Sequence, residues 1–116
     1  MRGVRRQVLH RHELIEGMAD VYVRSMRHGR DTLVAVCDAE LLGKTLKGGR
    51  VPFKVSESFY KGILADLDEA LEAISRATIC NLVGKRIVEA AIKNRIVHKA
   101  AVIYFGDVPH AQIVIL

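Results

Sequence analysis

Short apolar runs separated by turn residues constrain what this chain can fold into. Two runs near the start, residues 21–26 and 32–37, are rich in β-branched side chains and flank a segment that contains Gly29. This arrangement predicts a β-hairpin, because glycine readily adopts the positive φ of a tight turn. Two further runs, residues 101–105 and 111–116, close the chain and predict a second strand pair.

The segment between these hairpins predicts one strand and the first helix. Asp38 is expected to cap a short helical turn over residues 39–42, which Gly43 ends in a left-handed conformation. Residues 51–55 are expected to form a strand, and Ser56 precedes a short helix over residues 57–61.

Two more helices are expected before the last strands. Asp66 and Glu69 have the spacing of a capping box, so a helix should begin there and break near residues 76–78. A third helix is predicted over residues 79–94, where it would place Asn81 and Lys85 one turn apart. Five strands and about three helices predict an α+β fold, a single domain with helices packed on a mixed or antiparallel sheet.

Composition narrows the setting of the protein. The longest apolar run, residues 100–105, has six residues, far fewer than the roughly 18 that cross a bilayer. The two cysteines, Cys37 and Cys80, are isolated in apolar surroundings, as free thiols are in a reducing compartment. We therefore expect a cytoplasmic protein without membrane association. The scarcity of asparagine and glutamine is typical of thermophilic proteins.

Positive charge is concentrated at the start of the chain. The formal net charge is +5, and seven arginines fall within the first thirty residues. Residues 1–17, which include Arg2, Arg5 and Arg6, lack a sustained apolar stripe. We expect a basic extension or a misplaced start there, followed by one domain over residues 18–116. Basic surfaces of this kind are typical of proteins that bind phosphate groups or acidic partners.

Motifs for cofactor or metal chemistry are incomplete. Gly43-Lys44-Thr45 resembles the end of a phosphate-binding loop, but Asp38 occupies the place of the required glycine. His12 begins a zinc-protease spacing in which Glu16 replaces the second histidine. The sequence therefore predicts no cofactor and no metal site.

Cys37 and His110 could act as a nucleophile and its base if the sheet brings them together. A carboxylate at Asp38 would disfavour the Cys37 thiolate, so a buried structural cysteine is the favoured interpretation. His110 and Gln112 lie two residues apart and share one face of a strand after a rigid turn, which suits recognition. They could also be polar side chains on a solvated sheet face.

Two groups of residues are candidates for binding. A polar site could gather residues from loops and element ends: Asp38, Lys44, Asn81, Lys85, His110 and Gln112. Phosphate contacts could come from a second, basic group: Arg24, Arg27, Arg30, Lys47 and Arg50.

Four stretches together resemble a known family. They are residues 35–45 (AVCDAELLGKT), 55–62 (VSESFYKG), 77–86 (ATICNLVGKR) and 106–113 (GDVPHAQI). In this order they resemble the archaeal domain-of-unknown-function family 424, a group of short uncharacterised proteins. The resemblance runs from about Asp20 to the end of the chain. It implies an archaeal, cytoplasmic protein and brings no activity, substrate or cofactor with it.

Three functions remain open from the sequence. The first is a non-catalytic accessory module that binds RNA or a ribonucleoprotein, which the basic excess favours. The second is a small enzyme or ligand-binding protein that uses the polar site. The third is a structural subunit, such as a homodimer, that associates through an exposed last strand.

Overall fold

The computed structural model describes residues 19–115, and the predicted extension over residues 1–17 lies outside them. The strands are β1 (Val21–His28), β2 (Asp31–Asp38), β3 (Thr45–Leu46), β4 (Phe53–Lys54), β5 (Ile63–Ala65), β6 (Ile79–Val83), β7 (Ile103–Phe105) and β8 (Val108–Val114). The α-helices are α2 (Glu57–Tyr60), α3 (Leu67–Ser75) and α4 (Lys85–Lys93), and the 3-10 helices are η1 (Ala39–Leu41) and η2 (Lys99–Ala101). No helix among these residues is long and apolar enough to cross a membrane.

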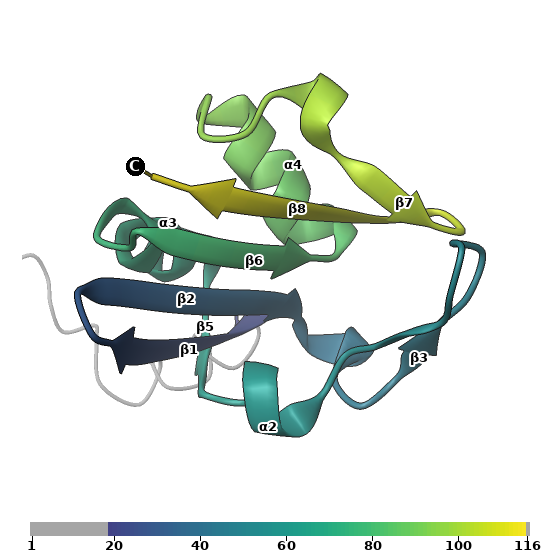
Figure 1. The fold of residues 1–116 in the computed structure, drawn as a ribbon, viewed down its shortest axis with the longest axis horizontal. Helices are drawn as coiled ribbons and strands as arrows, with labels where there is room; N and C mark the ends of the chain where they lie inside the picture. Colours follow the sequence, from purple (N-terminus) through teal and green to yellow (C-terminus); the bar gives the residue numbers. More distant parts are fainter. Residues whose placement is uncertain (1–18, 116) are drawn as a thin grey trace, which may run out of the picture.

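Six strands form one mixed sheet in the order β5-β1-β2-β6-β8-β7, and β3 pairs with β4 in a small second sheet. The strands β2 and β6 run parallel at the centre, and every other neighbouring pair in the main sheet is antiparallel. The helices α3 and α4 lie behind the sheet in the view of Figure 1, while α2 and β3 lie at its lower and right margins. The predicted α+β class is confirmed, with six strands in the main sheet instead of five.

Each face of the sheet carries its own hydrophobic core. Alternate strand residues such as Val36 and Leu82 pack against α3 and α4. The opposite face packs Cys37 and Val83 against residues from α2, β3 and β4, including Tyr60. The elements α2, β3 and β4 are short, so they bury only part of this face of the sheet.

Local signals in the sequence are confirmed where short-range contacts decide the structure. The strands β1 and β2 form the predicted hairpin, with Gly29 at φ 62°. The capping box is complete, because Glu69 N–H donates to Asp66 Oδ1 (2.8 Å) and Asp66 N–H donates to Glu69 Oε1 (3.0 Å). Helix α3 then ends before Arg76, where the break was expected.

Two expectations about the third helix are wrong. Residues 79–83 form strand β6, and the helix begins only at Lys85. Asn81 and Lys85 therefore do not share a helix face. The run from Ile79 to Val83 satisfies a helical stripe and a buried strand equally well, and pairing with β2 and β8 selects the strand.

The expectations for Asp38 and for the last strand also need correction. Asp38 precedes η1, but its side chain makes no hydrogen bond to that turn. Strand β8 is an edge strand only in part, because β7 pairs with it over Val108 to His110 and residues 111–114 pair with β6 alone. The predicted strand over residues 51–55 shortens to Phe53–Lys54, because Val55 bonds to Lys44 in a loop.

Candidate functional site

Residues of the polar group predicted from the sequence occupy separate places. Asp38 and Lys85 lie where β2 and β6 end, at the start of α4. Asn81, His110 and Gln112 lie together on the sheet face opposite α3 and α4. Lys44 is exposed in the segment that leads into β3. The structure thus divides one predicted site into an end-of-strand cluster and a sheet-face cluster.

The sheet-face cluster is built by strand register. Arg24 pairs with Ala35, Ala35 with Asn81, and Asn81 with Gln112, so one row crosses four strands. We call this the polar row. Arg24 and Asn81 are half-buried and Gln112 is exposed, and within residues 19–115 neither amide side chain forms a hydrogen bond to protein. Their hydrogen-bonding groups are available to a partner.

A second row of the same face is apolar. It contains Met26, Leu33, Ile79 and Val114, paired in that order across β1, β2, β6 and β8. The first three side chains are half-buried, and Val114 is 55% exposed. We call this the apolar row, and the two rows together the open face. Such a surface offers hydrogen bonds beside hydrophobic area.

The basic residues predicted to contact phosphates lie at two ends of the molecule. Arg24, Arg27 and Arg30 belong to the β1–β2 hairpin: Arg24 lies on the open face, Arg27 lies on the opposite face of β1, and Arg30 lies in the turn. Lys47 and Arg50 belong to the loop between β3 and β4, at the opposite end of the sheet in Figure 1. The five residues therefore do not form one patch.

His110 lies at the boundary between the open face and the covered part of the sheet. Its ring contacts Phe53 and Phe105, with centroid distances of 5.2 Å and 6.0 Å. Burial among these rings lowers the pKa of His110 below its ordinary value. The neutral imidazole is therefore favoured here. The ring packs against the two phenylalanines and stays partly exposed.

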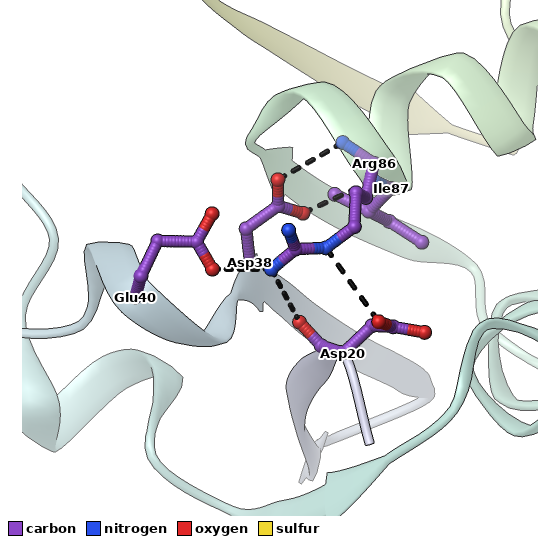
Figure 2. A network of polar contacts seen from close by, with 5 residues as sticks. All are labelled: Asp20, Asp38, Glu40, Arg86 and Ile87. Carbon is purple, nitrogen blue, oxygen red and sulfur yellow. Dashed lines mark hydrogen bonds and ion pairs between the residues drawn. The ribbon is translucent and has the colours of Figure 1, made fainter. Parts of the chain in front are cut away.

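The end-of-strand cluster centres on Asp38, which is 2% exposed. Arg86 N–H donates to Asp38 Oδ2 (2.9 Å) and Ile87 N–H donates to Oδ1 (3.1 Å), as Figure 2 shows. A residue 48 positions away in the chain thereby caps the start of α4. Burial raises the pKa of Asp38, and the two amide bonds oppose that rise.

Arg86 extends this cluster to the surface. Its guanidinium donates to the backbone oxygen of Asp20 (3.3 Å) and forms an ion pair with Glu40 (Figure 2). It also lies 3.8 Å from the Asp20 carboxylate. Nearby, Lys85 and Asp107 form an exposed ion pair at 3.5 Å. These contacts tie the start of β1, the end of β2 and the start of α4 together.

Gly84 makes the approach of Asp38 to α4 feasible. It has φ 123°, and a Cβ there would lie 2.2 Å from Asp38 Cγ. The sequence contained a signal for this contact, because a glycine between an apolar strand and a helix marks a close backbone approach. Arg86, Asp20 and Glu40 were not predicted, since their pairing depends on the order of the strands.

Both cysteines are structural. Cys37 and Cys80 are buried and free. Burial, followed by the nearby Asp38, raises the pKa of Cys37 to about 12, and burial raises that of Cys80 to about 11. Both thiols stay protonated at neutral pH, which confirms the interpretation of Cys37 as a buried structural residue. Within residues 19–115, no cluster of three or more His, Cys, Asp or Glu side chains could hold a metal ion.

Comparisons with known proteins agree with the resemblance in the sequence. The comparison with curated proteins found no match. A crystal structure of an uncharacterized conserved protein from Methanopyrus kandleri matches with a TM-score of 0.73 and 27% sequence identity, covering 84% of this chain and 93% of that chain. The family described as "Protein of unknown function (DUF424)" matches residues 26–116. The chain belongs to this family.

Proposed function

We propose that the protein is a non-catalytic RNA-binding module whose binding surface is the open face together with the β1–β2 hairpin. The polar row is the observation that carries this proposal. An arginine and two amides, Arg24, Asn81 and Gln112, lie in one row on β1, β6 and β8, in which β2 contributes the buried Ala35. Amide groups hydrogen-bond to base edges, and arginine binds phosphates or stacks on bases.

Charge next to the open face supports the same partner. His28 and Arg30 are exposed at the turn end of the β1–β2 hairpin, and Arg27 is exposed on the other face of β1. Asp31, the acidic residue of this hairpin, accepts a hydrogen bond from Thr78 Oγ1 at 3.0 Å. The hairpin is thus a basic border to a row of hydrogen-bonding side chains, which suits a polyanion with exposed bases.

The non-catalytic part of the proposal rests on how the reactive side chains are used. The Cys37 thiol is protonated and buried, and the Asp38 carboxylate caps α4. His110 packs between aromatic rings. Each of these three groups therefore has a structural task. We further propose a cytoplasmic location, where free thiols such as these persist.

Fluorescence anisotropy with a labelled single-stranded RNA of mixed sequence tests the proposal. The wild-type chain should bind, and binding should weaken steeply as salt is raised. Asn81→Ala and Gln112→Ala should each weaken binding about two- to tenfold, the value of one hydrogen bond of about 0.5–1.5 kcal/mol. Neither should reduce the free energy of unfolding by more than about 1 kcal/mol.

A matched pair of double variants separates the two basic groups. Arg24→Ala/Arg30→Ala and Lys47→Ala/Arg50→Ala each remove two positive charges. The first pair should weaken RNA binding strongly, whereas the second should have little effect because it lies at the other end of the sheet. Equal effects would show that only net charge matters and would overturn the open face as the site. Absence of RNA binding by the wild type would overturn the function itself.

A further inference from the structure

The turn that follows α4 combines an unfavourable backbone conformation with a concentration of positive charge. The helix ends at Lys93 with Asn94 as its C-cap, and Arg95 then adopts φ 61°. Arg95 N–H donates to the Ile92 oxygen (3.0 Å), and Ile96 N–H donates to the Ala91 oxygen (2.9 Å). This pair of bonds is a Schellman motif, which fixes the turn rigidly on the end of the helix.

An arginine is unfavourable at this position of the motif. The residue after the C-cap is usually glycine, because a side chain is strained in the left-handed conformation. Within residues 19–115, Arg95 is the one non-glycine residue with positive φ. The turn therefore keeps a long cationic side chain where glycine would make the fold more stable. Strain of this kind is found where a side chain has a task in binding.

Further basic side chains surround Arg95. Lys93, His98 and Lys99 are all exposed, and within the described part of the chain none of the four forms an ion pair. Together with Ile92 and Val97, three of them line a hollow of about 410 Å³. We call Lys93, Arg95, His98 and Lys99 the basic turn.

One hydrogen-bonding side chain of the basic turn, His98, is held in place by the backbone. His98 Nδ1 accepts a hydrogen bond from the Ala100 amide at 3.1 Å. In the neutral ring this leaves the proton on Nε2, which can donate to an anion. Val97 is buried, and it anchors the segment between Arg95 and His98 against the core formed with α3 and α4.

The basic turn lies at the same end of the sheet as the β1–β2 hairpin. Ile96 lines a hollow together with Ile113 and Ile115, at the end of β8. Ile115 N–H donates to the Thr78 oxygen (2.8 Å), and Thr78 Oγ1 donates to Asp31 in the hairpin (3.0 Å). The basic turn follows α4 on the helix side of the sheet, so an RNA strand that leaves the open face over Val114 would pass around the end of β8 to meet it.

We propose that the basic turn binds the phosphate backbone of the same RNA, as a second contact beyond the open face. This inference rests on the proposed function and adds a location for phosphate binding that is independent of base contacts. Phosphate contacts position a nucleic acid without reading its sequence. The basic turn should therefore raise affinity equally for RNAs of different sequence, and its contribution should vanish at high salt.

Arg95→Gly gives the sharpest test, because stability and binding should change in opposite directions. Release of the strained side chain should raise the melting temperature by about 3–6 °C. Affinity for a labelled 30-nucleotide single-stranded RNA should fall about fivefold at roughly 0.1 M salt, since one phosphate contact contributes a salt slope of about −0.7. Arg95→Lys should keep most of the affinity, and Lys61→Ala, an exposed charge on another element, should change it less than about twofold.

The possible results separate the two proposals. If Arg95→Gly and Lys99→Ala bind like the wild type while Asn81→Ala binds more weakly, the basic turn is excluded and the open face stands. If Arg95→Gly weakens binding with an unchanged salt slope, the loss does not come from a phosphate contact and the inference is wrong. If the wild type binds no RNA, both proposals fall.

Discussion

The Asp38 carboxylate can cap α4 only because the residue before the helix, Gly84, has no side chain. Gly84 has no room for a Cβ, which would meet the Asp38 carboxylate at 2.2 Å. Gly84→Ala should therefore lower the free energy of unfolding by about 3 kcal/mol or more, because it adds a clash to backbone strain and displaces the helix cap. Chemical denaturation measures this loss.

Gly29→Ala is the matched control for backbone strain alone. Gly29 also has a positive φ of 62°, but a Cβ there has no atom within 4 Å. This change should lower the free energy of unfolding by about 1 kcal/mol. Similar losses for the two variants would show that the Asp38 contact contributes little to stability.

His110 should make stability depend on pH. Its pKa is lowered by burial in the folded protein, so between that value and the ordinary value of 6.5 the unfolded chain binds more protons. Stability from this group is present above about pH 6.5 and decreases as the pH falls toward the folded pKa. The free energy of unfolding should therefore fall on acidification in the wild type and fall less in His110→Phe.

A neighbouring residue that does not titrate tests whether this dependence belongs to His110. Gln112 shares a face of β8 with His110, and Gln112→Ala should keep the pH dependence of the wild type because an amide carries no titrating proton. If His110→Phe and the wild type lose stability in parallel between pH 7 and pH 5, the buried imidazole is not its source.

Residue roles that depend on neighbours in sequence could be predicted, and those that depend on strand order could not. The capping pair Asp66 and Glu69 is three residues apart, so its spacing alone identifies it. Asp38 has the same chemistry, but it caps a helix 48 residues away. Only the parallel pairing of β2 with β6 brings it there. The sequence placed Asp38 at a strand end and assigned its carboxylate to the wrong turn.

At the scale of elements, the capping box of α3 should contribute measurably to stability. Asp66→Ala removes the acceptor for Glu69 N–H and should lower the free energy of unfolding by about 1 kcal/mol. Asp68→Ala removes the same charge from the same turn but no capping bond, so it should have a smaller effect. Equal losses in thermal or urea unfolding would mean that only charge near the helix start matters.

The first part of the third predicted helix, residues 79–83, is a strand because the segment is too short for its periodicity to identify it. The segment from Ile79 to Val83 is apolar except for Asn81, and its five residues are too few to distinguish a strand from a helical turn. Gly84 separates this segment from α4 and has a positive φ. The glycine therefore marks the boundary between strand and helix better than the apolar periodicity that runs through it. A helix at this position is also incompatible with the polar row, because Asn81 pairs with Gln112 only if both lie on strands.

At the scale of the whole molecule, the class of fold could be predicted but the order of strands could not. Hairpins at both ends of the chain with helices between them predict α+β, since each amphipathic face needs a partner. The central parallel pair joins segments about 45 residues apart, and no local pattern specifies that partner. The open face is a product of this order, because β1, β2, β6 and β8 each contribute a residue to both of its rows.

We predict that residues 1–17 are dispensable for folding. Both hydrophobic cores draw their described members from Val21 onward, and β1 begins there. A chain begun at Met18 should keep its melting temperature within a few degrees of the full chain and should retain RNA binding through the open face. A drop of about 15 °C, several kcal/mol for a domain of this size, would place the segment in the core or in an interface.

A chain begun at Met26, where the family match starts, provides the contrasting control. It lacks the part of β1 that pairs with β5, and with it Val21 and Val23, which are 0% and 6% exposed. Removing two buried side chains and most of the strand between β5 and β2 should cost more than the free energy of unfolding of a typical domain of this size. This shorter chain should therefore show no cooperative unfolding transition by circular dichroism, whereas the chain begun at Met18 should show one. Cooperative unfolding of both would mean that β1 is not required, and the six-stranded sheet would not be the folding unit.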